Sequence, residues 1–220
     1  MIRACWTVAV IMVVCDVAAS AWGYTVLPDR VPTHWNWNNQ VDGYGSKLIP
    51  TLLMPVVALG IIGLFAALPA LSPKGFEIDS FRPTVAVILL ITVGLMSYLH
   101  GVILYATWNS VTGGPAIDLG RILLGGIFGS FGIMGNFMGK IHKNFYIGVR
   151  LPWTLASDRV WNDTHRLAAW VWTGMGALGV GLLVMGANIL ILIALLVVSC
   201  MVPAVYSFVH YRSLERHGAL

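Results

Sequence analysis

Long apolar runs alternate with short polar segments along the whole chain. A helix that crosses a bilayer needs about 20 mostly apolar residues, and six of the runs reach roughly that length. Because hydrocarbon offers no partners to backbone polar groups, helices that satisfy these groups internally are the expected structure. The pattern therefore predicts an all-α polytopic membrane protein, a bundle of six transmembrane helices at roughly residues 2–22, 48–70, 83–107, 120–139, 165–184 and 189–210.

Turn-forming residues separate the apolar runs. Pro28 and Pro32 break any helix that leaves the first run, and Ser72-Pro73-Lys74-Gly75 separates the second from the third. The segment Met185-Gly186-Ala187-Asn188 is so short that the last two helices should form a tight antiparallel hairpin. We expect residues 1–220 to form a single membrane domain.

Composition agrees with this interpretation. Hydrophobic residues make up 58% of the chain and charged residues only 10%, whereas about a quarter of a soluble domain is charged. The first run resembles a signal peptide, with Arg3 before it and Ala19-Ser20-Ala21 near its end, and we interpret it as a retained first span. Three cysteines lie in apolar runs without a CxxC pair, which favours neither a disulfide framework nor a zinc site.

Basic residues predict the orientation in the membrane, because cytoplasmic loops carry an excess of Lys and Arg. With the N-terminus inside, the outside set is Arg30, Lys47 and Arg121, against ten basic residues inside. Both termini are therefore expected in the cytoplasm. The chain has no basic, aromatic-interleaved patch long enough to grip a nucleic-acid backbone, so we expect no nucleic-acid partner.

The first polar segment, residues 23–47, contains LPDRVPTHWNWNNQVDGYGSK and is expected on the outer face. One His and one Asp make a poor metal site, since most sites need three or four ligands. One interpretation is a structured lid held by Trp packing and Asx turns, and the other is a ligand-binding surface. The candidate binding residues are His34, Trp35, Asn36, Asp42, Tyr44 and Lys47.

Two ionisable residues lie inside the predicted spans. Asp16 and His100 fall at similar depth in the outer halves of the first and third spans. An unpaired charge at mid-bilayer costs about 3 kcal/mol or more, so such residues are usually paired or functional. We expect a polar cluster there with His34 above it, either as part of a binding site or as a buried structural hydrogen bond.

The second polar segment, residues 140–166, is predicted to be an interfacial or re-entrant elbow on the cytoplasmic side. Gly148 permits a bend, and Pro152 pushes the residue before it toward an extended conformation. Either Thr154 or Ser157 can cap a new helix that runs into the fifth span. We expect one connected cluster, in which Arg150 and Arg166 find acceptors in freed carbonyls, the Asn144 amide and Asp158.

The elbow residues support two interpretations: a structural tie to the bundle or a cytoplasmic docking surface. The candidates are Asn144, Gly148, Arg150, Pro152, Trp153, Thr154, Ser157, Trp161, Thr164, His165 and Arg166. The sequence contains no Walker loop, GxSxG or HExxH motif, and the spacing of its His residues is not a ligand pattern. We therefore expect no catalytic residue, no metal, no cofactor and no enzymatic activity.

Both polar segments resemble a known family. The order Asn144-x-x-x-Gly148-x-Arg150-x-Pro152-Trp153-Thr154-Leu155, followed by Ser157, Trp161 and Thr164-His165-Arg166, resembles the signature of the SdpI/YfhL family of bacterial membrane proteins. Leu27-Pro28-Asp29, Val31-Pro32, His34-Trp35-Asn36 and Asp42-Gly43-Tyr44-Gly45-Ser46-Lys47 are similar to the domain of unknown function at the N-terminus of that family. The regions concerned are 8–62 and 139–210. The chain departs from the family pattern at Leu151, where Thr is common, and at Asn38-Asn39, where a glycine-containing turn is usual.

The resemblance implies a function at the bacterial cytoplasmic (inner) membrane. The family is named for a Bacillus immunity protein that protects its host from a secreted killing peptide and holds a transcriptional repressor at the membrane. It implies immunity to a peptide toxin, recruitment of a cytoplasmic regulator, or both. The alternative from another class is a transporter or an accessory subunit of a larger membrane complex. The G-x-x-x-G pairs Gly125/Gly129 and Gly135/Gly139 permit close helix packing, either within the chain or in a homo-oligomer.

Overall fold

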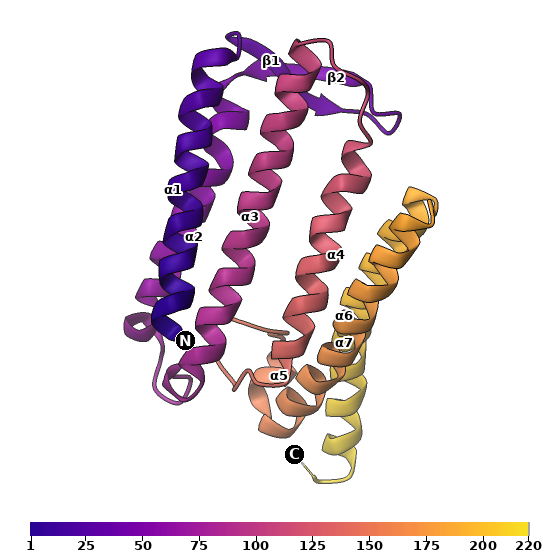
Figure 1. The fold of residues 1–220 in the computed structure, drawn as a ribbon. Helices are drawn as coiled ribbons and strands as arrows, with labels where there is room; N and C mark the ends of the chain where they lie inside the picture. The colour runs from indigo at the N-terminus through magenta and orange to yellow at the C-terminus, as the bar shows by residue number, and fades with distance from the viewer. Residues whose placement is uncertain (220) are drawn as a thin grey trace. The chain divides into compact units, whose positions relative to one another are not determined.

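The computed structural model describes residues 1–219 and is mainly helical. Six of its helices are long and apolar enough to cross a membrane, which confirms the predicted fold class. They are α1 (Ile2–Val26), α2 (Leu48–Leu71), α3 (Arg82–Val111), α4 (Leu119–Met138), α6 (Asp158–Val184) and α7 (Ile189–Arg216), as labelled in Figure 1. Helix α6 begins at Asp158 and runs on through the fifth apolar run, and Ser157, one of the two expected caps, is its N-cap.

The polar segment after α1 contains two strands that the sequence analysis did not predict. Strands β1 (Arg30–Trp35) and β2 (Val41–Ser46) pair in antiparallel register, and Figure 1 shows them as a hairpin following α1. Register shifts on either side of His34 interrupt the ladder. Pro32 and these irregularities hide the alternation by which a strand is recognised in sequence.

The remaining elements are short. The 3-10 turn η1 (Asp79–Phe81) precedes α3, and α5 (Pro152–Ala156) precedes α6. Contacts between Cα atoms divide the chain into two compact units. Unit 1 contains Arg3–Phe65 and Leu89–Ile127, and unit 2 contains Ala66–Ile88 and the chain from Phe128 onward. The single membrane domain expected from the sequence stays a prediction.

The core of unit 1 is built on small residues. Ala9 and Val13 of α1, Ala58 of α2, and Leu89 and Val93 of α3 form one buried cluster. Alanine at these positions lets the helix backbones approach closely, which favours association where lipid supplies no hydrophobic driving force. A second cluster of Leu27, Val31 and Leu104 packs the base of the β-hairpin against α3.

In unit 2, glycines bring α4 and α6 into contact. A Cβ atom placed on Gly176 would lie 2.3 Å from the Cα of Gly132, and one on Gly135 would lie 2.4 Å from the Thr173 hydroxyl oxygen. Of the glycines singled out in the sequence, Gly135 is in this contact, whereas Gly129 has open space around it. The small-residue interface therefore exists, with a spacing different from the one expected.

Helices α6 and α7 form the expected hairpin, in which the Asn188 side chain accepts from the Leu190 N–H.

Candidate functional site

The β-hairpin of unit 1 is held by short local bonds at its turn. The Asn36 side-chain oxygen accepts the N–H groups of Asn38 at 2.9 Å and Gln40 at 3.1 Å, which is the expected Asx turn. Across the strands, His34 Nδ1 lies 2.5 Å from the Asp42 carboxylate, and the His34 side chain is 70% exposed. These bonds order the hairpin and leave most of its side chains in reach of a ligand.

Aromatic rings of the hairpin are presented outward. Tyr44 is 58% exposed, with the Arg30 guanidinium 5.7 Å from its ring centroid, and Trp37 at the turn is 74% exposed. Trp35, at the end of β1, is only partly exposed. Exposed aromatics with a polar rim are typical of a protein-binding surface. Trp37 was not among the predicted site residues, although its place in the WNW triplet could have suggested it.

The base of the hairpin is tied down by Lys47. Its ammonium group lies 3.1 Å from the Asp29 carboxylate and 4.4 Å from the centroid of the Tyr24 ring. It also donates to the Leu27 carbonyl at 3.4 Å. Lys47 therefore links both ends of the hairpin segment to the end of α1, which is a positioning role within the predicted site.

Asp16 and His100 meet in a polar cluster, as predicted. The Nε2 atom of His100 is 3.2 Å from the Asp16 main-chain carbonyl and 3.1 Å from the Ser20 hydroxyl. Ser97 donates to the Asp16 carboxylate at 2.6 Å, and the Ser20 hydroxyl lies 2.5 Å from the Thr51 carbonyl. The cluster thus joins α1, α2 and α3. His34 does not join it through any hydrogen bond seen in residues 1–219, because its ring bonds Asp42.

The cluster fixes the orientation of the His100 ring. Since the Asp16 carbonyl can only accept, Nε2 carries the hydrogen of this bond. Nδ1 is buried and has no hydrogen-bond partner among residues 1–219. The two serines were missed in the sequence, although Ser20 lies one turn from Asp16 and Ser97 one turn from His100, on the same helix faces.

The elbow of unit 2, residues 140–166, is organised by a buried asparagine. Asn144 donates through its amide nitrogen to the carbonyls of His142 at 2.8 Å and Ile147 at 3.1 Å. Its side-chain oxygen accepts the N–H groups of Tyr146 and Ile147, both at 2.8 Å. The residue is fully buried, so this one side chain satisfies the backbone of a turn that has no regular secondary structure.

His165 joins the bend to α6. Its Nδ1–H donates to the Trp161 carbonyl at 2.8 Å, and its Nε2 accepts the Val149 N–H at 3.0 Å. Both ring nitrogens are used in this way only by the neutral imidazole, because a protonated ring has no acceptor. Gly148 has φ +113°, and a Cβ atom there would lie 2.2 Å from His165 Nε2. Glycine is required at this position both by conformation and by space.

Threonine and tryptophan side chains complete the buried part of the elbow. Thr154 donates to the Val149 carbonyl and accepts the Leu151 N–H, each at 2.8 Å, while Pro152 begins α5. The indole N–H of Trp161 reaches the Ile141 carbonyl at 2.7 Å, and that of Trp153 reaches the Ser207 hydroxyl of α7 at 2.6 Å. Thr164 is also buried, and its hydroxyl has no partner within the described chain.

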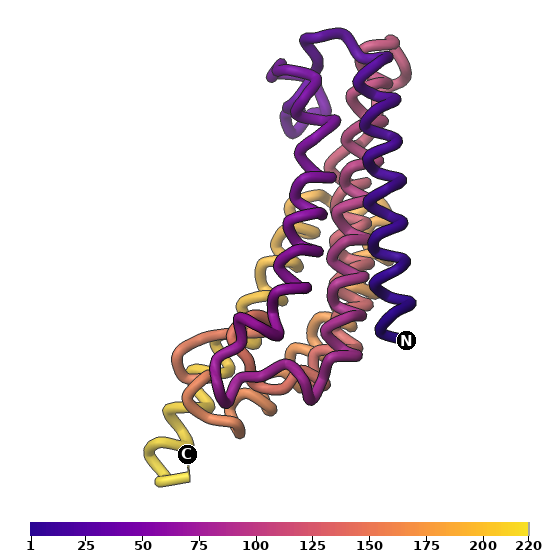
Figure 2. The backbone as a smooth tube through the Cα atoms, turned by 90° about the vertical axis from the view of Figure 1, so that its left-hand side faces the viewer, coloured from indigo at the N-terminus to yellow at the C-terminus, as the bar shows by residue number. Residues whose placement is uncertain are grey.

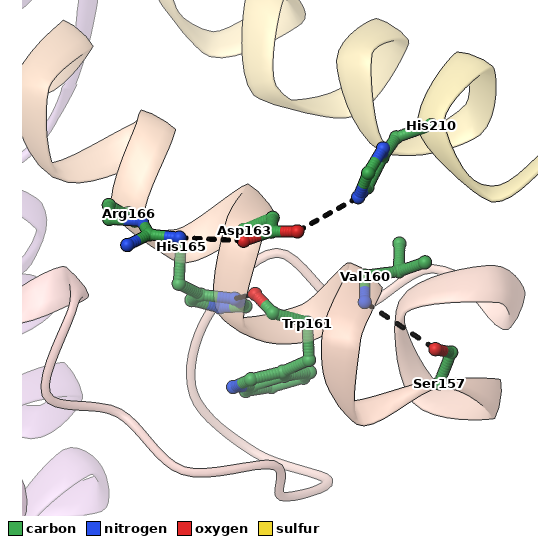
Figure 3. Close-up of polar contacts among 7 residues, drawn as sticks. All are labelled: Ser157, Val160, Trp161, Asp163, His165, Arg166 and His210. Carbon is green, nitrogen blue, oxygen red and sulfur yellow. Dashed lines mark hydrogen bonds and ion pairs between the residues drawn. The ribbon is translucent and has the colours of Figure 1, made fainter. Parts of the chain in front are cut away.

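The charged residues of the elbow lie at its surface. Arg150 donates to the Phe145 carbonyl, and Arg166, 73% exposed, pairs with Asp163 at 2.8 Å. Figure 3 shows Asp163 between Arg166 and His210 of α7, with His210 at 2.9 Å, and Ser157 capping α6 through the Val160 N–H. Asp158 pairs with Lys143 at 2.5 Å. Of the acceptors expected for the two arginines, a backbone carbonyl is confirmed for Arg150. The expectation for Asp158 is wrong, because Asp158 pairs with Lys143 and Arg166 pairs with Asp163.

The described chain offers hydrogen-bonding and ionic groups rather than a metal centre. No group of three or more His, Cys, Asp or Glu in residues 1–219 is arranged to hold a metal ion.

The contact between Asp163 and His210 was not predicted, since nothing in the sequence relates two residues so far apart. It ties α6 to α7 at the elbow.

Both sites coincide with regions shared with known proteins. Residues 140–207 match the model of the SdpI/YfhL protein family, and residues 11–59 match that of a domain of unknown function, DUF1648. The immunity protein SdpI of Bacillus subtilis (strain 168) is 28% identical over 212 residues, which cover 94% of this chain and 96% of that protein. No solved structure matches the chain. The first match contains the whole elbow and the second contains the β-hairpin.

Proposed function

We propose that the chain, which is similar to the SdpI/YfhL family of bacterial membrane proteins over residues 140–207, is an immunity protein that protects its own cell from a secreted antimicrobial peptide. The observation that carries this proposal is the similarity to the Bacillus immunity protein, which extends over nearly the whole of both chains. A shared bundle alone would give little information about function. Here the similarity includes both polar segments, where binding residues concentrate.

The proposed topology places both termini in the cytoplasm. Three candidate spans, α2, α3 and α4, separate the β-hairpin from the elbow, so an odd number of crossings puts these two segments on opposite sides of the bilayer. The excess of Lys and Arg around the elbow favours the cytoplasm for that side. The β-hairpin then faces outward, where a secreted peptide arrives.

Labelling with an impermeant thiol reagent tests this topology. The parent for the test has Cys5, Cys15 and Cys200 replaced by Ala. In intact cells, Asn39→Cys at the hairpin turn is expected to react and Ser213→Cys near the end of α7 is expected to be protected. Reaction of Ser213→Cys alone would reverse the orientation.

The β-hairpin is the proposed contact surface for the peptide. Its candidate residues His34, Asp42 and Tyr44 are exposed. The strand ladder and the Asx turn already order the backbone that carries them. Binding to an ordered surface costs less conformational entropy than binding to a flexible loop. The Asp16–His100 cluster supports this surface from within unit 1.

The elbow is the proposed contact surface for a cytoplasmic regulator. Its buried residues hold the backbone, and Arg166, which is 73% exposed and paired with Asp163, is left at its surface. A regulator that binds there needs an acidic face. This second role is independent of protection and can be lost separately.

Complementation tests the main proposal. The chain is expressed in a Bacillus strain that lacks its own SdpI, and survival is measured against the peptide to which SdpI gives immunity. Survival well above the empty vector is expected, with SdpI itself as the positive control. Killing at the rate of the empty vector, despite membrane expression equal to that of SdpI, would contradict protection from that peptide.

A further inference from the structure

Unit 2 carries most of the positive charge of the protein. Of the 13 Lys and Arg residues, nine lie in unit 2, which contains only five of the nine acidic residues. Four of these nine basic residues pair with acidic side chains. The other five are exposed and form no salt bridge with an acidic side chain of residues 1–219; we call them the basic face: Lys74, Lys140, Arg150, Arg159 and Arg216.

Contacts within unit 2 bring the segments that carry the basic face together. The Phe76 ring, two residues from Lys74, packs edge-on against Phe145 at 4.4 Å between centroids, and the Phe145 carbonyl holds Arg150. The Tyr146 hydroxyl donates to the Leu71 carbonyl at the end of α2. In Figure 2 the connection from α2 to α3, the elbow and the end of α7 lie at the same end of unit 2.

The position of the basic face relative to the spans indicates a membrane interface. Lys140 lies two residues after the end of α4, and Arg216 is the last residue of α7. In the elbow, the centroid of the Trp153 ring lies 5.1 Å from that of Phe208, and the indole N–H donates to the Ser207 hydroxyl. Tryptophan with an apolar body and a bonded polar tip is typical of the headgroup level of a bilayer.

We propose that the basic face binds the phosphate groups of anionic phospholipids in the leaflet that surrounds the elbow. Clusters of Lys and Arg beside transmembrane helices attract anionic lipid, by a factor of roughly five for each residue near the surface. Arg150 is the best-placed member, because its bond to the Phe145 carbonyl through Nη1 fixes the guanidinium. A fixed guanidinium presents its remaining N–H groups to phosphate oxygens at a smaller entropic cost.

A lipid suits this surface better than an acidic protein because the charges are placed at the ends of spans, where headgroups are always present. This inference does not depend on immunity, since it concerns the surface of unit 2 and not protection. Its test therefore uses purified protein and no toxin.

Native mass spectrometry of the full chain provides the test. The protein is released from nanodiscs that contain equal amounts of phosphatidylglycerol and phosphatidylcholine, and the retained lipids are counted. The parent is expected to retain phosphatidylglycerol in clear excess. Arg150→Gln combined with Arg159→Gln is expected to reduce that excess by an order of magnitude or more, since each arginine contributes roughly fivefold.

Two controls separate lipid binding from misfolding and from general charge. Arg212→Gln combined with Glu215→Gln removes an arginine of unit 2 together with its paired carboxylate, leaves the net charge unchanged and is expected to leave the ratio unchanged. Raising the salt concentration to 1 M before release should lower the ratio of retained phosphatidylglycerol to phosphatidylcholine, because salt screens the attraction between exposed charges. This second control uses the parent protein alone. The melting temperature in pure phosphatidylcholine should be the same for parent and double variant.

Either of two results overturns the proposal: equal retention of both lipids by the parent, or an unchanged ratio in a double variant that melts like the parent. In another outcome, the parent shows no lipid preference and instead captures an acidic protein through Arg150 and Arg159. That result would assign the basic face to protein docking and would also overturn the proposal.

Discussion

The β-hairpin and the elbow both interrupt apolar runs, but they are ordered in opposite ways. The hairpin is ordered by its backbone ladder and by surface bonds such as His34–Asp42. In the elbow, buried side chains bond to the backbone, with Asn144, Thr154 and His165 supplying donors and acceptors that regular structure would supply elsewhere.

This difference indicates where function can reside. A side chain that satisfies buried backbone groups cannot also contact a partner, because turning toward the partner would leave those groups without hydrogen bonds. The elbow motif is therefore chiefly structural, and only its arginines and neighbouring lysines are left for binding. In the hairpin the reverse holds, since Tyr44 and Trp37 are exposed and can be changed without opening the backbone ladder.

The largest expected effect is the loss of the Asn144 amide. Asn144→Ala leaves two N–H groups and two carbonyls of a partly buried turn without their partner, and each such group costs about 1 kcal/mol, near the lower end of the range for buried groups. We expect the free energy of unfolding to fall by about 4 kcal/mol, measured by titration with a denaturing detergent. Asn136→Ala is the matched control, because Asn136 is exposed and its amide bonds only carbonyls of its own helix. Similar losses for both variants would show that the elbow does not depend on Asn144.

A slightly smaller loss is expected from a methyl group at Gly148. Gly148→Ala combines the cost of a positive φ, about 1–2 kcal/mol, with an overlap on His165 that breaks the bond to the Val149 N–H. Gly75→Ala is the control, because Gly75 has φ +83° but nothing lies within 4 Å of the added carbon. We expect a loss of about 3 kcal/mol for the first and about 1 kcal/mol for the second. Equal melting temperatures for the two variants would exclude the steric role of His165.

The helices were predictable from sequence because the bilayer imposes one length and one backbone solution on every span. The bend at Gly148 and the cap at Ser157 were predictable for a similar reason, since each depends on one residue type in one local geometry. The β-hairpin was missed because its register shifts disturb the alternation that marks strands. Pairings such as Asp163–His210 depend on how α6 and α7 pack, which no local pattern reports.

The contact between α4 and α6 in unit 2 depends on glycine and provides the third prediction. Gly176→Ala would put a methyl group 2.3 Å from the Cα of Gly132, so the helices must separate, at a cost of about 2 kcal/mol. Gly181→Ala in the same helix meets nothing within 4 Å and is expected to change the melting temperature little. If Gly181→Ala proves as damaging as Gly176→Ala, Gly181 lies at an interface outside the isolated chain, such as a homodimer.

The smallest effect on stability, and the largest on function, is expected in the hairpin. Trp37 and Tyr44 are exposed, and substitutions at such positions usually change stability by no more than about 0.5 kcal/mol. If the hairpin receives the peptide, Trp37→Ala combined with Tyr44→Ala should lower the toxin concentration that cells survive by about tenfold, because aromatic residues commonly dominate binding energy. The matched control is Trp170→Ala, since Trp170 is 78% exposed on a spanning helix and is expected to face lipid. Survival is measured in the complementation strain at equal membrane expression. Full protection by the hairpin variant, in a protein that melts like the parent, would remove the hairpin as the contact surface and leave immunity itself standing.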